Sequence, residues 1–240
     1  MIQGSSIPKS LGSARKPKLP DVLGLELASL IEERIIRLEF EPGKHLTEAQ
    51  ICEEFDVSRS PVREAFRQLE AMGLVVRHTR RGIRVTPMTL QDVSEIYLVR
   101  TPLEVIAATL AAENATDEDL TFLTHQVGRL EAALKSEDPE DFFSANMAYF
   151  DRIHAITGNH TLKSILRTIE KQAMRYRYFA HVHSKEMQKN STARLRKILR
   201  FMKGRDVEAV RKETETMMLE AQAMIVDILK QYPALSENID

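Results

Sequence analysis

The chain has 240 residues, 43% of them hydrophobic and 29% charged, and its 34 basic and 35 acidic residues leave a formal net charge of −1. This composition excludes disordered and membrane-embedded classes, and the length favours two domains over one. No apolar run reaches the roughly 18 residues that a membrane span needs, and no signal peptide is recognisable, so we expect a cytoplasmic protein without a membrane partner. The single cysteine, Cys52, excludes an internal disulfide.

The first quarter of the chain predicts a tail and two helices. Residues 1–20 are rich in Ser, Gly, Pro and Lys without an apolar period, which predicts a flexible basic tail. Apolar residues recur at helical spacing over 25–38, which predicts the first helix. Thr47 and Gln50 then have the spacing of a capping box, which predicts the start of a second, short helix.

A third helix and a hairpin are expected next. Ser58 suits an N-cap and a proline follows in the first turn, which predicts a helix that runs to Met72. Two β-prone runs, 74–77 and 83–86, flank a turn in which Gly82 can adopt a positive φ. Three helices and a β-hairpin wing predict a winged helix-turn-helix over 21–88.

The rest of the chain has helical patterns without a convincing strand. Short breaks separate these patterns, and short connections favour antiparallel neighbours. We therefore expect a mainly α protein, in which an all-α antiparallel helical bundle over 89–235 follows the winged helix-turn-helix. The expected helices of the bundle are 90–113, 117–136, 139–157, 161–178, 185–203 and 206–231.

Positive charge gathers in the segment 57–88, which holds seven arginines against two acidic residues. Three of them, Arg59, Arg63 and Arg67, recur every fourth residue and so line a helix face separate from the apolar stripe. Arginine can donate two hydrogen bonds to the major-groove edge of guanine, and serine hydroxyls suit phosphate contacts. The segment therefore predicts binding to double-stranded DNA, with a solvated basic helix face as the alternative.

At these residues the sequence resembles the GntR family of bacterial regulators. The resemblance rests on Gly43-x-x-Leu46, on the run Val57-Ser58-Arg59-Ser60-Pro61-Val62-Arg63-Glu64-Ala65, on Gly73-Leu74-Val75 and on Arg81-Gly82. It implies that Ser58, Arg59, Ser60 and Arg63 contact DNA, and that Arg81 and Gly82 at the wing tip enter the adjacent minor groove.

The helical half resembles the FCD domain, which is the ligand-binding domain of the FadR-like branch of that family. Arg100-x-x-x-Glu104, Thr157-Gly158-Asn159-x-x-Leu162 and Asp206-x-x-Ala209 carry this resemblance. Many FCD domains hold a divalent metal with an Asp or Asn and three histidines. Counted from these motifs, Asn146 stands at the acid position, and the histidine positions hold Phe150, Leu195 and Met217. The resemblance therefore predicts a pocket without a metal, and no cofactor.

Periodicity also places these residues toward the interior of the bundle. Asn146 and Phe150 share an inward stripe, and Arg100 lies on another, where its guanidinium needs an anion. Both Glu104, one turn on, and a carboxylate effector suit that role, and for Phe150 and Met217 plain core packing is an equal alternative. Tyr176 and Tyr178 are further polar candidates. The predicted effector-binding residues are Arg100, Asn146, Phe150, Arg175, Leu195 and Met217.

Two other histidine groups are weighed as metal sites. Asp151 and His154 are expected on the polar side of their helix, and His181 and His183, two residues apart, point to different faces, so spacing argues against both.

The sequence also has no diagnostic nucleophile, carboxylate pair or cofactor loop, so we expect no enzyme. The prediction is a ligand-responsive repressor that binds a palindromic operator as a homodimer, with a small organic acid or related metabolite as effector. Its alternatives are a constitutive DNA-binding protein whose helical half only dimerises, and a metal-dependent sensor.

Overall fold

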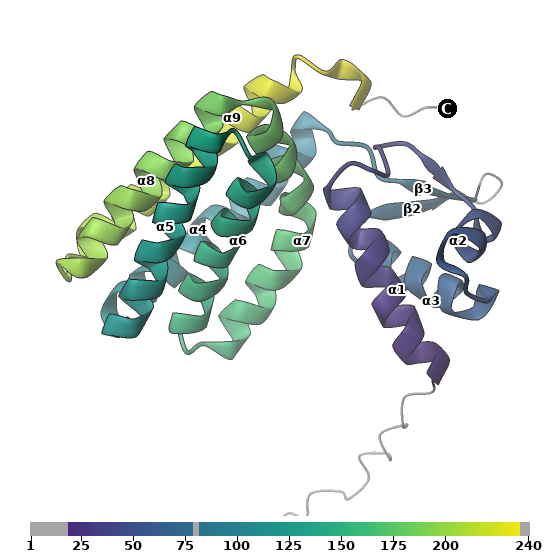
Figure 1. Ribbon diagram of the computed structural model, residues 1–240, viewed down its shortest axis with the longest axis horizontal. Helices are drawn as coiled ribbons and strands as arrows, with labels where there is room; N and C mark the ends of the chain where they lie inside the picture. The colour runs from purple at the N-terminus through teal and green to yellow at the C-terminus, as the bar shows by residue number, and fades with distance from the viewer. Residues whose placement is uncertain (1–18, 79–81, 236–240) are drawn as a thin grey trace, which may run out of the picture.

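A computed structural model describes residues 19–78 and 82–235. The N-terminal part contains helices α1 (Leu19–Ile36), α2 (Glu48–Phe55) and α3 (Arg59–Ala71), and strands β1 (His45–Leu46), β2 (Val75–His78) and β3 (Gly82–Val85). The predicted winged helix-turn-helix is confirmed (Figure 1). Helix α1 begins six residues before the predicted start, because Pro20 is tolerated in a first helical turn. The predicted tail was therefore wrong for its last two residues, and its other residues lie outside the described part.

Strand β1 is an element that the sequence did not predict. It pairs antiparallel with β3, with Leu46 opposite Ile83, and β3 also pairs with β2, which gives the order β1-β3-β2. A strand of two residues is too short to show an alternating pattern. The wing is consequently the outer part of a three-stranded sheet rather than an isolated hairpin.

Local contacts explain how these elements begin and turn. Thr47 and Gln50 form the predicted capping box at the start of α2. Ser58 is the N-cap residue of α3, but its side chain makes no capping hydrogen bond. Gly82 has a φ of +76°, and a Cβ at this position would lie 2.7 Å from Nε2 of His45. Glycine is therefore required where the wing enters β3.

The C-terminal part is a bundle of six helices in the described residues, as predicted (Figure 1). Helix α4 packs along α9, α5 along α6, and α8 along α9. Helix α7 runs five residues beyond its predicted end. The elements are α4 (Leu90–Asn114), α5 (Asp117–Ser136), α6 (Pro139–Ile156), α7 (His160–His183), α8 (Lys185–Lys203), α9 (Val207–Leu229) and the 3-10 helix η1 (Pro233–Leu235).

Two apolar cores lie in the two parts of the molecule. One consists of buried residues between Leu27 and Val85, and the other of buried residues from Met88 onward. A small third cluster joins them, in which Ile36 of α1 meets Phe143 and Tyr178 of the bundle. Among the described helices, none has the length and apolar character that a bilayer crossing requires.

Candidate DNA-binding surface and effector pocket

Helix α3 exposes its basic residues and buries its apolar ones. Ser58, Arg59 and Ser60 at its start are exposed, and so is Arg63 one turn later. The opposite side of the helix is buried in the N-terminal core through Val62, Ala65 and Leu69. The arginine stripe therefore faces away from the protein, as the spacing predicted.

The exposed arginines differ in what holds them. Within the described residues, Arg59 has no hydrogen-bond or ion-pair partner. Arg63 donates from Nε to Glu48 at 2.9 Å, and Arg67 donates to Glu64 at 3.1 Å. Exposed ion pairs of this kind contribute about 0–1 kcal/mol, so phosphate can replace the carboxylate at little cost.

The wing carries the remaining predicted DNA contacts. Gly82 is exposed at the start of β3, whereas Arg81 lies outside the described residues. Arg84 points back into the domain and donates to the carbonyl of Gly43 at 3.0 Å. Of the wing arginines that the structure describes, Arg77 remains on the surface, 3.4 Å from Glu70.

A pocket of about 30 Å³ lies among the helices of the bundle. Five of the six predicted effector-binding residues line it: Arg100, Asn146, Phe150, Leu195 and Met217. The other lining residues are Tyr97, Arg177, His181, Met187, Ser191, Met218 and Ala221. The residues that the motifs identified therefore come from four helices and lie at one pocket. The cavity is about the size of one water molecule, so its own side chains nearly fill it.

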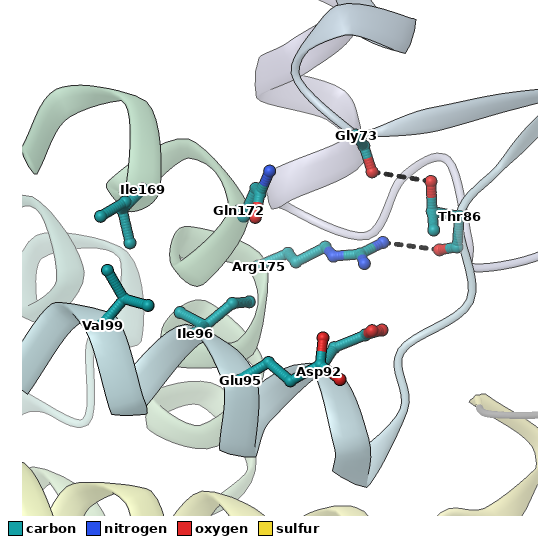
Figure 2. A pocket seen from close by; sticks show the side chains of 9 residues that line it. All are labelled: Gly73, Thr86, Asp92, Glu95, Ile96, Val99, Ile169, Gln172 and Arg175. Carbon is teal, nitrogen blue, oxygen red and sulfur yellow. Dashed lines mark hydrogen bonds between the residues drawn. The ribbon is translucent and has the colours of Figure 1, made fainter. Parts of the chain in front are cut away.

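Arg175, the sixth predicted effector residue, is not in this pocket. It lines a groove of about 360 Å³ between the two parts of the molecule, and Figure 2 shows it reaching from α7 toward Thr86. Its Nη1 donates to the carbonyl of Thr86 at 2.5 Å and its Nη2 to that of Pro87 at 3.0 Å. The structure does not bring Arg175 together with the other five predicted residues, because its side of α7 faces the N-terminal part rather than the bundle interior. Neither of the two tyrosine candidates lines the pocket: Tyr176 donates to Asp92 and Tyr178 to Glu140.

Arg100 forms an ion pair with Glu104, which is one of the two partners that the sequence suggested for it. Its Nη2 donates to Oε1 of Glu104 at 2.8 Å, and both side chains are buried. Burial by itself would raise the pKa of Glu104, but the positive charge of Arg100 and the hydrogen bond from His154 outweigh it and hold this pKa at about 2. The Nε of Arg100 is buried without a partner, so the residue retains an unused donor.

The pair belongs to a larger buried network that sequence reasoning missed. Arg177 donates from Nη1 to Glu170 at 2.8 Å and from Nη2 to Oδ1 of Asn146 at 2.5 Å. Glu170 also lies 3.7 Å from Arg100, so two arginines and two glutamates balance in charge. The available signal was the spacing of Glu170 and Arg177, seven residues apart on one face of α7.

His154 is also part of this network, which corrects the expectation that it lies on the polar side of α6. It is buried, and its Nε2 lies 2.9 Å from Oε2 of Glu104. Burial alone would lower the pKa of His154, but the hydrogen bond to Glu104 and the negative charges of Glu104 and Glu170 outweigh it and raise this pKa. The expectation failed because α4 and α7 both pack on α6, so the buried face of α6 is broader than a single apolar stripe.

His181 is a second buried histidine that lines the pocket. Its Nε2 lies 3.1 Å from Oγ of Ser191, and its Nδ1 is buried without a partner. Burial, together with the charge of Arg177, lowers its pKa to about 3. His181 is therefore neutral at physiological pH, and its Nδ1 can form a hydrogen bond to a ligand without adding a charge to the pocket.

The four positions where FCD domains hold a metal do not fit one here. Phe150, Leu195 and Met217 offer no nitrogen or oxygen, and Oδ1 of Asn146 already accepts from Arg177. A divalent ion needs several such donors, so no step is assigned to a metal at these positions.

Comparison with known proteins identifies the family. The family "Bacterial regulatory proteins, gntR family" matches residues 23–85, and the FCD domain matches residues 95–219. This chain belongs to the GntR family of transcription regulators, in the branch that carries an FCD domain. The family and the relatives are regulators and not enzymes, as predicted.

Curated GntR regulators match much of the chain. The HTH-type transcriptional regulator YdhC of Bacillus subtilis is 35% identical over 147 residues, which are 60% of this chain and 65% of that protein. The HTH-type transcriptional repressor GlaR of Escherichia coli is 30% identical over 62% of this chain and 69% of its own length.

The fold is shared with solved structures. McbR/YncC of E. coli superposes with a TM-score of 0.75 at 22% identity, over 88% of this chain and 98% of that one. A GntR regulator from Rhodococcus sp. RHA1 has a TM-score of 0.71 at 24% identity, over 87% of this chain and 98% of its own. At these identities the likeness confirms the fold and does not extend to ligands.

Proposed function

We propose that this GntR regulator is a ligand-responsive repressor that binds a palindromic operator as a dimer, with DNA-binding domain 21–88 and effector domain 89–235. One observation carries the proposal: an unpaired arginine at the start of the recognition helix coexists with a small pocket in the bundle, which two buried arginines and a buried asparagine line. The arginine is free to contact DNA. The pocket can bind a small molecule if the surrounding side chains move.

The recognition helix α3 enters the major groove with its first turn. Arg59 and Arg63 contact guanine edges or phosphates, and Ser58 and Ser60 donate to phosphate oxygens. The wing tip, with Gly82 and the neighbouring arginine at position 81, lies along the adjacent minor groove. Support comes from the exposure of Ser58, Arg59, Ser60 and Arg63, and from the hydroxyl of Ser58, which makes no capping hydrogen bond.

A second copy of the chain covers an apolar face of α4. Leu98 is 77% exposed, Val99 51% and Ile106 48%, and Ile106 follows the other two by about two turns of α4. Exposed apolar faces of this kind are typical of interaction sites, and a palindromic operator requires two winged helices related by a two-fold axis. Leu98→Glu would therefore convert a dimer into a monomer in light scattering.

The effector is a small organic acid that is bound without a metal. Its carboxylate takes the place of Asn146 on Nη2 of Arg177 and accepts a further hydrogen bond from Nε of Arg100. The cavity of about 30 Å³ is too small for any metabolite, so binding requires the pocket to open. The flexible side chains of Met187, Met217 and Met218 line the pocket and can yield space.

Helix α7 transmits this opening to the DNA-binding domain. Glu170 and Arg177 belong to the buried network, while residues on the other side of the same helix hold the N-terminal part. Lys171 contacts Glu32 at 2.8 Å, Gln172 donates to the carbonyl of Met72 at 3.3 Å, and Arg175 binds the segment before α4. A ligand that favours another position of α7 would therefore change the spacing of the two winged helices.

Selection of binding sites from random DNA, followed by titration, tests the DNA-binding part. The wild type should enrich a palindrome. Arg59→Ala should lose about 1–3 kcal/mol of discrimination per half-site while its melting temperature stays unchanged, because Arg59 has no partner in the described protein. Arg196→Ala, which removes an exposed arginine from α8 of the bundle, is the matched control. Unchanged affinity of Arg59→Ala for the selected site would contradict the proposal.

A constitutive DNA-binding protein, whose helical domain only dimerises, is the second candidate. The observation in its favour is the small cavity, which the contact between Arg177 and Asn146 helps to close. A thermal-shift screen of carboxylic acids separates the two candidates. Acids that stabilise the wild type and change its DNA affinity support the repressor, whereas stabilisation by none of them supports the constitutive protein.

A further inference from the structure

Three side chains with metal-binding groups meet beside the buried network, outside the effector pocket. They are Asp151 and His154 of α6 and Glu170 of α7, and one ligand atom of each lies within 4.8 Å of the others. His154 and Glu170 are buried, whereas Asp151 is exposed and opens the cluster to solvent on one side. We propose that these three residues bind a divalent transition-metal ion.

The orientation of His154 favours this role. A carboxylate oxygen accepts, so Nε2 of His154 carries the proton of its 2.9 Å hydrogen bond to Oε2 of Glu104. Nδ1 is then free of a proton, and it lies 3.9 Å from Oε2 of Glu170. Histidines that bind metals typically donate their other N–H to a carboxylate, and Glu104 supplies this support.

The distances suit two ligands of one ion better than a direct contact. A separation of 3.9 Å between Nδ1 and Oε2 is too long for a hydrogen bond. Ligands that are each about 2.0–2.2 Å from a metal lie up to about 4.4 Å apart, so an ion fits between these two atoms. Asp151 supplies the third ligand, and water from the exposed side completes the coordination.

Charge points to a cation at the same place. Arg100 and Arg177 balance Glu104 and Glu170, so Asp151 adds one uncompensated negative charge when His154 is neutral. One imidazole with two carboxylates favours Zn²⁺, Mn²⁺ or Fe²⁺.

This site differs from the one that FCD domains use. It shares no residue with Asn146, Phe150, Leu195 and Met217, and His154 follows Phe150 by one turn of α6. It is linked to the effector pocket through Glu170, whose Oε1 accepts from Arg177, and through His154, whose partner Glu104 also accepts from Arg100. None of the three proposed ligands lines the pocket itself.

Isothermal titration of the full-length, metal-stripped protein with Zn²⁺ tests the proposal. We expect one Zn²⁺ per chain, and at least tenfold weaker binding by Asp151→Asn, because loss of even a supporting group costs about 10–100-fold. Asp151 makes no hydrogen bond or ion pair in the described structure, so this variant keeps its fold. Glu113→Gln, which removes an exposed carboxylate without an ion-pair partner on α4, is the matched control and should bind like the wild type.

A second readout tests the role of the imidazole. Below the pKa of His154, Zn²⁺ must displace its proton, so titrations at pH 6 in buffers of different ionisation enthalpy should show proton release that vanishes in His154→Gln. Absence of stoichiometric Zn²⁺ in the wild type, or unchanged affinity in Asp151→Asn, would overturn the proposal. Binding that survives Asp151→Asn but is lost in Asn146→Ala would also overturn it, because the metal would then lie in the effector pocket. Operator binding by the metal-free protein is tested separately through Arg59.

Discussion

Arginines serve opposite purposes in the two halves of this protein. On α3, Arg59 and Arg63 lie in solvent and are held by one exposed carboxylate at most. In the bundle, Arg100 and Arg177 are almost fully buried and are held by Glu104, Glu170 and Asn146. The same side chain therefore remains available to an outside partner in one half and is engaged by the fold in the other.

The difference shows why a charge on its own does not identify a site. Breaking an exposed ion pair costs little free energy, so exposed arginines can readily bind a polyanion such as DNA, which neutralises many of them at once. Buried charges cost several kcal/mol each to remove from water, so a ligand can bind there only if it replaces the partners that the fold supplies. On α3, DNA binding requires that the arginines are free to contact phosphates and bases. In the bundle, ligand binding requires that the ligand replaces Glu104, Glu170 or Asn146 as a partner of the buried arginines.

The largest expected effect on stability comes from breaking a buried ion pair rather than an exposed one. Glu104→Ala leaves Arg100 buried without its main partner and removes the acceptor of His154, which should cost about 3–5 kcal/mol of the free energy of unfolding. Glu48→Ala removes the partner of Arg63, and should cost about 0–1 kcal/mol because that pair is exposed. Urea unfolding of the two variants measures both values. Similar losses in the two variants would contradict the comparison.

The next effect concerns the two buried histidines, whose pKa shifts have opposite signs. His181 has a folded-state pKa of about 3, below the unfolded value, so the unfolded chain takes up the proton first and stability is lost as pH falls below about 6.5. His154 has a raised pKa, so its contribution is present below about 6.5 and is lost as pH rises through the folded pKa.

Substitution of each histidine isolates its contribution to the pH dependence of the free energy of unfolding. The difference between the wild type and His181→Gln should change by up to about 1.4 kcal/mol per pH unit between pH 6 and pH 4. The difference between the wild type and His154→Gln should instead change as the pH rises above about 6.5. Unfolding in urea at several pH values provides the measurement. If both differences remained flat with pH, neither histidine would be held in the protonation state described here.

Much of the fold could be predicted from the sequence because its signals are local. The capping box at Thr47 and the helical periods of the bundle depend on residues a few positions apart, and all the predicted helices are present. Strand β1 could not be predicted in this way, because it exists only through its pairing with β3.

The pocket was predictable as far as motif spacing extends. Counting from motifs placed Asn146, Leu195 and Met217 at one cavity. The counting did not extend to α7: Arg175, predicted only as an additional polar group, lies outside this cavity, and Arg177 was missed, since only the position of the neighbouring domain decides which side of α7 faces the bundle interior. The burial of His154 likewise follows from two helices packing on α6, which no single periodicity encodes.

The smallest effect on stability is expected at the start of α3, where function and folding separate most clearly. Ser58 occupies the N-cap position without a capping hydrogen bond, whereas Thr47 forms a complete capping box at α2. Thr47→Ala should therefore cost about 0.5–2 kcal/mol of unfolding free energy, and Ser58→Ala well under that. Operator affinity should show the reverse order, because the free hydroxyl of Ser58 is proposed to contact phosphate. Thermal unfolding and DNA titration of the two variants measure both quantities. A large loss of stability in Ser58→Ala would mean that the hydroxyl caps the helix in solution, and its proposed contact with DNA would then have to compete with that bond.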